Sequence, residues 1–287
     1  MPRATYQFAE LDQEVFTLLK RLGYQPQVIF DIGASNGYWS RFIHEVLPDA
    51  KYHLFEPLSD HIPDYGARMQ TVLKEYPDFQ LHKFALGDEV TDKTINLYAD
   101  GFSSTVVEMD SMQGVQQLTV PMMTLDAAIA KFDLPQPQAI KADIQGFELA
   151  MLKGARNTLP NVDILLLESW LSRGYGPGCG LLIEMANWLL QFDFYLWDFA
   201  EYFRDDTGKL YTVDCVFVNG KNLPLLADPQ VYAPRSENNY PPQQAELERL
   251  KAENLALHQE ILAMKSSKFW QLQSQWMKLK RALGATE

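Results

Sequence analysis

The stretch of sequence that decides the fold is Asp31-Ile32-Gly33-Ala34-Ser35-Asn36-Gly37, which directly follows the apolar run Val28-Ile29-Phe30. An amphipathic stretch begins at Trp39, which indicates a loop between a strand and a helix. Gly33 lets the backbone turn tightly and approach a ligand, and Gly37 lets the helix pack closely. Because open α/β sheets bind ligands outside the carboxyl ends of their strands, we predict a ligand-binding loop here.

The position of Asp31 distinguishes this loop from one that binds a dinucleotide. A dinucleotide loop brings the pyrophosphate close to the helix N-terminus and usually has three glycines in the spacing GxGxxG. Here a carboxylate precedes the first glycine, where it would repel a phosphate. S-Adenosylmethionine carries an amino-acid moiety and a sulfonium instead, and a carboxylate beside them is favourable. The loop therefore favours S-adenosylmethionine as the cofactor.

Glu56 supports the same interpretation. It ends the second predicted strand, 25 residues after Asp31, where its carboxylate can accept hydrogen bonds from both ribose hydroxyls of a nucleoside. The alternative is that Asp31 and Gly33 form only a strand-to-helix turn with a capping acid.

Strand-like and helix-like segments alternate along most of the chain, which indicates a mainly parallel sheet with helices on both faces. A polar turn at 205–208 separates the last two strands, so they can form a hairpin with an antiparallel strand at the sheet edge. We therefore predict a Rossmann-like α/β fold. The predicted strands are 28–31, 52–56, 79–86, 139–143, 164–168, 192–199 and 213–218, and the predicted helices are 10–22, 39–47, 65–76, 124–132, 146–152 and 181–190.

By composition the chain divides into an N-terminal helical segment (1–26), the α/β domain (27–221), a linker with five prolines (222–244) and a helical tail (245–287). The tail carries two apolar stripes. The first is typical of a coiled coil, and the second, flanked by basic residues, is typical of a helix that lies on anionic lipid. A homodimer, a helix docked on its own domain and a peripheral membrane contact all stay open. The stripes are Leu247, Leu250, Asn254, Leu257, Ile261 and Met264, then Phe269, Leu272, Trp276, Leu279 and Leu283.

Net charge and composition indicate which binding partners and which cellular compartment to expect. The net charge is −12, and because residues 265–287 carry +4, the first 264 residues carry −16. Such an acidic body lacks the basic footprint of a nucleic-acid-binding protein, so we expect no nucleic-acid partner. Cys179 and Cys215 form no CxxC pair, and no signal peptide or membrane span is evident. We expect a cytoplasmic protein, with peripheral contact at the inner face of the membrane as an option.

Several short segments together resemble the FkbM family of methyltransferases. They are Asp31 to Gly37, Phe55-Glu56-Pro57, Ala85-Leu86-Gly87, Leu125-Asp126 and the segment from Lys141 to Glu148, and the similarity runs from about residue 20 to about 219. The resemblance implies a class I methyltransferase sheet with one reversed strand, use of S-adenosylmethionine, and O-methylation as the usual reaction. The cofactor-binding residues expected from the loop, the strand ends and the resemblance are Asp31, Gly33, Ala34, Asn36, Gly37, Glu56, Pro57, Leu86 and Asp143.

The chain departs from the family at Gln145, where relatives usually have an acid. The candidates for a general base are Asp143, Glu168 and His82, while Glu148 better suits a first-turn acid that complements a helix dipole. The five histidines show no metal-ligand spacing and the cysteines form no cluster, so we assign no metal ligands, and a site made of carboxylates alone stays open. Ser103-Ser104 and the glycine-rich loop 173–178 are candidates for the rim of an acceptor pocket.

The sequence favours an O-methyltransferase that acts on a hydroxyl group of a sugar, a glycan or a secondary metabolite. Two alternatives remain open. One is a methyltransferase-like scaffold that has lost activity, which Gln145 favours. The other is a nicotinamide-linked oxidoreductase, which the missing third glycine disfavours.

Overall fold

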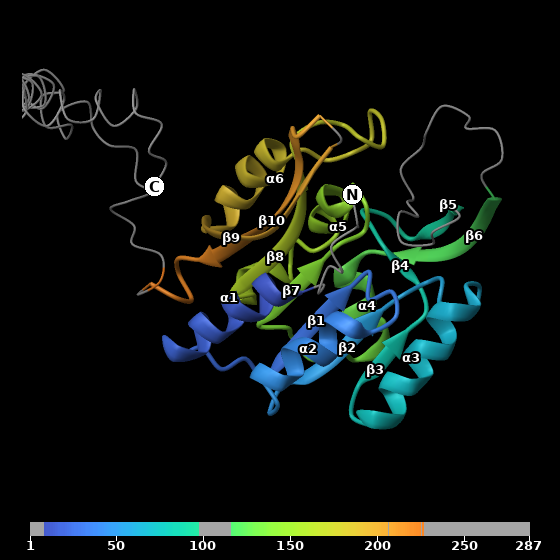
Figure 1. Cartoon of the computed structure of the whole chain (residues 1–287), viewed down its shortest axis with the longest axis horizontal. Helices are drawn as coiled ribbons and strands as arrows, with labels where there is room; N and C mark the ends of the chain where they lie inside the picture. Colours follow the sequence, from blue (N-terminus) through green and yellow to red (C-terminus); the bar gives the residue numbers. More distant parts are fainter. Residues whose placement is uncertain (1–8, 98–115, 206, 225, 227–287) are drawn as a thin grey trace, which may run out of the picture. The chain divides into compact units, whose positions relative to one another are not determined.

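A seven-stranded sheet forms the centre of the computed structural model, which describes residues 9–97, 116–205, 207–224 and 226. Figure 1 shows the sheet with the strand order β3-β2-β1-β7-β8-β10-β9. Its strands are β1 (Val28–Ile32), β2 (Lys51–Phe55), β3 (Gln80–His82), β7 (Ala139–Ala142), β8 (Ile164–Trp170), β9 (Phe194–Arg204) and β10 (Leu210–Asn219).

The sheet is parallel except at one strand. β1, β2, β3, β7 and β8 pair in parallel, whereas β10 is antiparallel to both of its neighbours, β8 and β9. The predicted hairpin is therefore present. The reversed strand is β10, however, and it lies one place inside the edge, because β9 crosses over to become the edge strand. A mainly parallel sheet with one reversed strand confirms the fold class implied by the resemblance.

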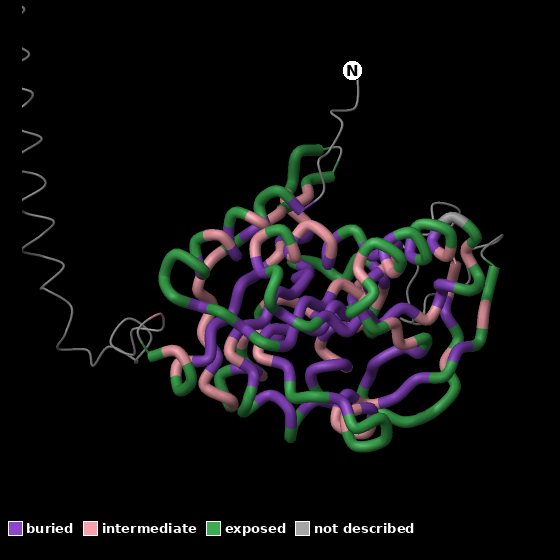
Figure 2. The backbone as a smooth tube through the Cα atoms, turned by 90° about the horizontal axis from the view of Figure 1, so that it is seen from below, coloured by how far each residue is buried: buried purple, intermediate pink, exposed green. Residues whose placement is uncertain are grey.

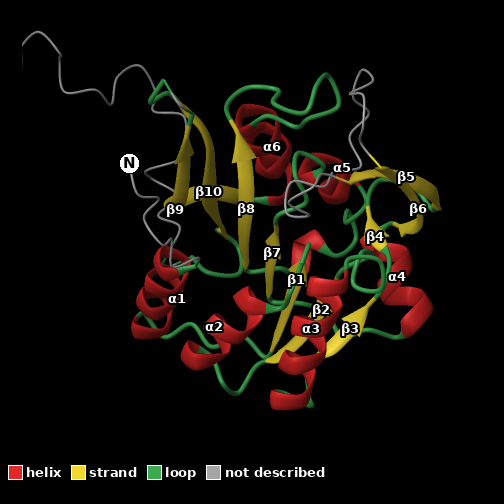
Figure 3. Ribbon diagram, turned by 45° about the vertical axis from the view of Figure 1, so that its right-hand side comes forward, coloured by secondary structure: helices red, strands yellow, loops and turns green. Residues whose placement is uncertain are grey.

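Helices cover both faces of the sheet (Figure 3). α1 (Glu10–Arg21), α2 (Tyr38–Val46) and α3 (Pro63–Glu75) pack on one face, and α4 (Leu125–Phe132), α5 (Glu148–Lys153) and α6 (Leu182–Leu189) on the other. Two apolar cores result, one on each side of the sheet, and Figure 2 shows that the buried backbone (purple) lies mainly in the interior, with exposed backbone (green) around it. Strands buried on both faces explain why β1 and β8 are buried along their whole length.

The predicted strand 79–86 is wrong as a single element. It divides into β3 and β4 (Ala85–Leu86), and β4 leaves the main sheet to form a second sheet with β5 (Thr91–Leu97) and β6 (Gln116–Met123). The β2–β3 ladder ends where the Glu56 N–H donates to His82 O at 2.9 Å, because the next N–H that could extend it, that of Leu58, donates instead to the Glu56 carboxylate at 2.8 Å. This break turns Leu86 toward the carboxyl end of the main sheet.

Other predictions fall partly or wholly outside the described residues. Most of the linker, the whole helical tail and Ser103-Ser104 lie there.

Thr124 is the N-cap of α4, since its hydroxyl oxygen accepts a hydrogen bond from Ala127 N at 3.1 Å. Within the described part of the chain, no helix has the length and apolar character needed to cross a bilayer.

Candidate functional site

The loop after β1 is built around two glycines with positive φ angles. Gly33 (φ 77°) and Gly37 (φ 80°) both occupy the left-handed region, which glycine adopts without steric cost. A Cβ atom on Gly33 would lie 2.0 Å from the carbonyl oxygen of Asp143, so no side chain fits there. The N–H groups of Gly33 and Ala34 both donate to Phe55 O, at 3.0 and 3.1 Å. The loop is thus held between the ends of β1, β2 and β7.

Glu56 lies beneath this loop and is almost completely buried. One carboxylate oxygen accepts a hydrogen bond from Ser35 N at 2.7 Å and the other from Leu58 N at 2.8 Å. Burial raises the pKa of Glu56 to about 7, although the two backbone donors partly oppose this rise. Each oxygen can still accept a second hydrogen bond from a ligand, because a carboxylate oxygen has two lone pairs.

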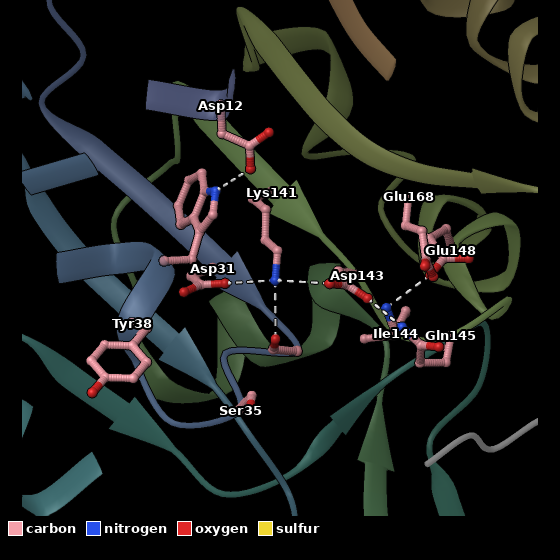
Figure 4. A network of polar contacts seen from close by, with 12 residues as sticks. Asp12, Asp31, Ser35, Tyr38, Lys141, Asp143, Ile144, Gln145, Glu148 and Glu168 are labelled. Atoms are coloured by element: carbon pink, nitrogen blue, oxygen red, sulfur yellow. Dashed lines mark hydrogen bonds and ion pairs between the residues drawn. The ribbon is translucent and has the colours of Figure 1, made fainter. Parts of the chain in front are cut away.

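Lys141 lies between two carboxylates at the ends of β1 and β7 (Figure 4). Its Nζ is 3.3 Å from Asp31 Oδ1 and 3.8 Å from Asp143 Oδ2, and it donates to Gly33 O at 3.1 Å. Burial acts to lower the pKa of Lys141, but Asp31 and Asp143 outweigh it, so the net pKa is raised and the ammonium stays charged. Asp31 is fully buried and also accepts a hydrogen bond from Ser40 Oγ at 2.7 Å. This network fixes the glycine loop against β7.

The turn after β7 is organised by Glu148 and Gln145. Glu148 is buried and one of its oxygens accepts from Ile144 N at 2.8 Å and Gly146 N at 3.3 Å, in agreement with a helix-terminal acid rather than a base. Gln145, with φ 56°, donates from Nε2 to Asp143 Oδ1 at 2.7 Å. Its Oε1 accepts from the Tyr175 hydroxyl at 2.5 Å. An amide makes both contacts at once, whereas an ionised acid at this position could not donate to Asp143.

A cavity of about 410 Å³ opens at the carboxyl edge of the sheet, and it extends from α1 to the second sheet. Eight of the predicted site residues line this cavity, whereas Asp31, Gly37 and His82 do not. Asp31 and Gly37 shape the loop from behind. The eight residues that line it are Gly33, Ala34, Asn36, Glu56, Pro57, Leu86, Asp143 and Glu168.

His82 lies away from the cavity that holds the other candidates. Its Nε2 is 3.1 Å from His53 Nδ1, the two rings are stacked, and the ring of Phe55 stacks on it at 4.7 Å. Burial lowers the pKa of His82. The alternation of strand residues predicts that His82 and Phe84 share a face, but it does not indicate which face meets the site. The structure gives His82 no geometric basis as a general base.

The glycine-rich loop 173–178 contacts the site through one side chain. Tyr175 packs on Trp170, with ring centroids 4.9 Å apart, and its hydroxyl binds Gln145. None of residues 173–178 lines the cavity. Their role in the described structure is to support the turn after β7.

Sequence analysis missed several charged residues of the cavity, namely Asp12, Lys141, Glu201 and Asp214. Asp12 is on the first turn of α1, where an acid ordinarily faces solvent, yet it is 4% exposed and accepts from Trp39 Nε1 at 2.8 Å. The sequence around Asp214 could have identified it as a site residue, because it is a single acid within the apolar strand Val213-Asp214-Cys215-Val216-Phe217. An acid in a buried strand needs a partner or a function.

Together, the mainly parallel sheet, the glycine loop and the acid at the end of the next strand define an α/β protein with a ligand site at the carboxyl edge. The sequence model of the FkbM methyltransferase domain matches residues 31–196, which is more than half of the chain. The chain belongs to the FkbM methyltransferase family.

Individual relatives are distant. The hexuronic acid methyltransferase AglP of Haloferax volcanii is 24% identical over 160 residues, which cover 55% of this chain and 62% of AglP. The chain therefore spans less than two thirds of that relative's length. Among solved structures, the methyltransferase FkbM from Methylobacillus flagellatus KT is 19% identical with a TM-score of 0.43, over 67% of this chain and 43% of the other. A putative O-methyltransferase from Klebsiella pneumoniae is 13% identical with a TM-score of 0.44, over 75% and 83%.

Proposed function

We propose that this methyltransferase transfers the methyl group of S-adenosylmethionine to a hydroxyl group of a sugar, glycan or related small molecule. The observation that carries the proposal is the buried carboxylate of Glu56, which faces the cavity beneath the glycine loop and has acceptor capacity left on both oxygens. Two adjacent ribose hydroxyls are the complementary donors.

The residues of the cavity fit this cofactor. Gly33 lets the loop lie directly against Asp143 at the edge of the cavity, and Leu58, Phe84 and Leu86 supply an apolar surface for an adenine ring. Carboxylates outnumber cationic side chains on the lining, which favours a ligand with a sulfonium and an ammonium group. A nicotinamide dinucleotide would bring two phosphates to the same surface.

The chain's own residues have two tasks in such a transfer. When bound, the cofactor supplies an electrophilic methyl group on its sulfonium. The loop, Glu56 and the Lys141 network fix the positions of the groups that contact it, so that an acceptor oxygen can be aligned with the methyl carbon. Asp143 and Glu168 line the cavity and can take the proton of the acceptor hydroxyl. Gln145 orients Asp143 for this by its hydrogen bond to Oδ1.

Support for a sugar acceptor comes from AglP, whose name states that it methylates a hexuronic acid. The FkbM domain model, for its part, matches residues 31–196, which include the glycine loop and most of the sheet. We propose O-methylation on the same ground, since methylation of a sugar ring normally occurs at a hydroxyl.

The first experiment is a calorimetric titration of S-adenosylmethionine into the wild type and into Glu56→Ala. We expect saturable binding to the wild type and binding at least about tenfold weaker in the variant, because two charge-assisted hydrogen bonds are lost. Asp78→Asn, an exposed change outside the cavity, is the matched control. No binding, or preferential binding of NADH, would overturn the proposal.

A second candidate is a scaffold that binds the cofactor without turnover. The hydrogen bond from Gln145 to Asp143 favours it, because it occupies one oxygen of a candidate base. Cofactor binding with no methyl transfer to any member of a panel of glycosides would support the scaffold.

A further inference from the structure

The part of the cavity over α1, β8, β10 and β9 contains none of the residues assigned to the cofactor. We propose that this part is an acceptor subsite for neutral or cationic sugars, and that it selects against uronic acids and other anionic acceptors. The inference rests on the proposed function and specifies its substrate class. It is carried by four carboxylates that we call the acidic wall: Asp12, Glu168, Glu201 and Asp214.

The topology brings the acidic wall together at one edge of the sheet. Glu168 on β8 and Asp214 on β10 are direct partners in the antiparallel register. Side chains of directly opposed residues point to the same face, with Cβ atoms about 4.5–5.5 Å apart. Glu201 lies near the carboxyl end of β9, and because β10 is reversed, Asp214 lies near its amino end. All three therefore lie at the carboxyl edge of the parallel strands, beside Asp143.

The wall has hydrogen-bond acceptors left over for a ligand. Asp12 is 4% exposed, its Oδ2 accepts from the Trp39 indole, and its buried Oδ1 has no hydrogen-bond partner within the described structure. Glu168 is 8% exposed and its Oε2 accepts from Trp170 Nε1 at 3.2 Å. Burial, reinforced by neighbouring carboxylates, raises the pKa of Glu168 and of Asp214 well above the ordinary values. Because Glu168 and Asp214 are directly opposed in the ladder, an anionic group placed beside them would make ionisation of either one more costly.

Within the described lining, the acidic wall shares its nearest cation, Lys141, with other acids: the ammonium acts to lower the pKa of Asp12 and of Asp214, but burial outweighs it at both. The lining contains two cationic side chains, Lys141 and Arg68. Lys141 is bound to Asp31, Asp143 and the Gly33 carbonyl. Arg68 is exposed on α3, which lies by β2 and β3 on the cofactor side (Figure 1). Hydroxyl and ammonium groups can donate to the acidic wall, whereas an anionic acceptor would find acids there and no cation of its own to pair with.

The expected acceptor thus differs from the one in the name of AglP, which is a hexuronic acid. The distinction is testable with three probes that share one ring: methyl glucoside, methyl glucosaminide and methyl glucuronide. They are neutral, cationic and anionic, respectively, near neutral pH.

Saturation-transfer NMR titrations of the full chain, loaded with S-adenosylhomocysteine, measure the three affinities. We expect the glucosaminide and the glucoside to bind at least about tenfold more tightly than the glucuronide. In Glu168→Gln and Asp214→Asn the discrimination against the glucuronide should shrink several-fold, and in Asp78→Asn it should not change. Binding of S-adenosylhomocysteine by each variant shows that it is folded.

Equal affinities, no signal from any probe, or a preference for the glucuronide in the wild type would each overturn the inference. Those outcomes leave the proposed function standing, because binding of the cofactor product is measured separately. Failure of the wild type to bind S-adenosylhomocysteine would instead overturn the proposed function.

Discussion

Two opposing effects meet at the carboxylate of Glu56: burial favours its neutral form, whereas binding of ribose hydroxyls favours its ionised form. Burial raises its pKa to about 7, but ribose hydroxyls are best bound by the charged form. We predict that S-adenosylmethionine affinity decreases as the pH falls through 7, by up to about tenfold per pH unit below the pKa. Calorimetry at pH 8, 7 and 6 measures the slope. Glu56→Gln should remove it, and a slope that persists in this variant would assign the titration to another group.

Gln145 makes a contact that an acid at the same position cannot make. In Gln145→Glu the donor to Asp143 Oδ1 is replaced by a second carboxylate at hydrogen-bonding distance. We expect the free energy of unfolding to fall by about 1–3 kcal/mol, because a bond is lost and like charges meet. Urea unfolding measures this change.

Gln117→Glu is the matched control for Gln145→Glu, since Gln117 donates to Asn96 Oδ1 at 3.0 Å on the exposed face of β6. There the expected change is within about 0.5 kcal/mol. Equal changes in the free energy of unfolding at the two positions would mean that the hydrogen bond to Asp143 contributes no more to stability than an exposed amide contact.

At the scale of elements, Lys141 joins β7 to the loop after β1. Lys141→Met leaves the fully buried Asp31 without its cation, so we predict a loss of about 3–5 kcal/mol in the free energy of unfolding. The exposed pair of Lys83 and Asp60 offers a control, with Nζ 2.7 Å from Oδ1. Lys83→Met should cost no more than about 1 kcal/mol. A similar cost for both substitutions in urea unfolding would contradict the structural role of Lys141.

Sequence patterns predicted most of the elements, because buried parallel strands are continuous apolar runs that end abruptly. β1, β2, β7 and β8 were recognisable in this way, although β8 continues two residues past Glu168. The division of 79–86 into β3 and β4 was not recognisable, since it depends on which distant strand each half pairs with.

The cofactor-binding half of the site could be predicted from the sequence, because it depends on the segment 31–37 and on Glu56 at the end of the next strand. The acidic wall could not be predicted in this way. Its members come from α1, β8, β9 and β10, and only the tertiary structure makes them neighbours. Asp12 illustrates the limit. Its position on an amphipathic helix indicated a solvated acid, but the indole of Trp39 on α2 covers it.

For the whole molecule, several buried acids bind protons more tightly in the folded state than in the unfolded chain. Burial raises the pKa of Asp12 and Glu56 to about 7 and that of Glu148 to about 8. Between about pH 4.5 and 8 the folded state therefore holds more protons, and stability decreases as the pH rises. We predict that the ligand-free protein is more stable at pH 6 than at pH 8 by about 1–3 kcal/mol. Urea unfolding at both pH values tests this, with Glu148→Gln expected to reduce the difference; a more stable protein at pH 8 would contradict it.

The tail at 245–287 is proposed to mediate association, either with a second copy of the chain or with an anionic membrane surface. Removal of these residues should abolish co-sedimentation with anionic liposomes or halve the mass measured by light scattering. Binding of S-adenosylmethionine should be unchanged and serves as the control. If neither association changes, the tail has another role.

The reversal of β10 has a consequence for how acceptor preference can evolve. Because β9 ends and β10 begins at the site, the short turn between Arg204 and Leu210 is the single connection between two members of the acidic wall. Insertions in a hairpin turn leave the strand pairing on either side intact. A longer turn would therefore add protein next to the strands that carry Glu201 and Asp214, while the segments of Gly33 and Glu56, far away in the sequence, would stay unchanged.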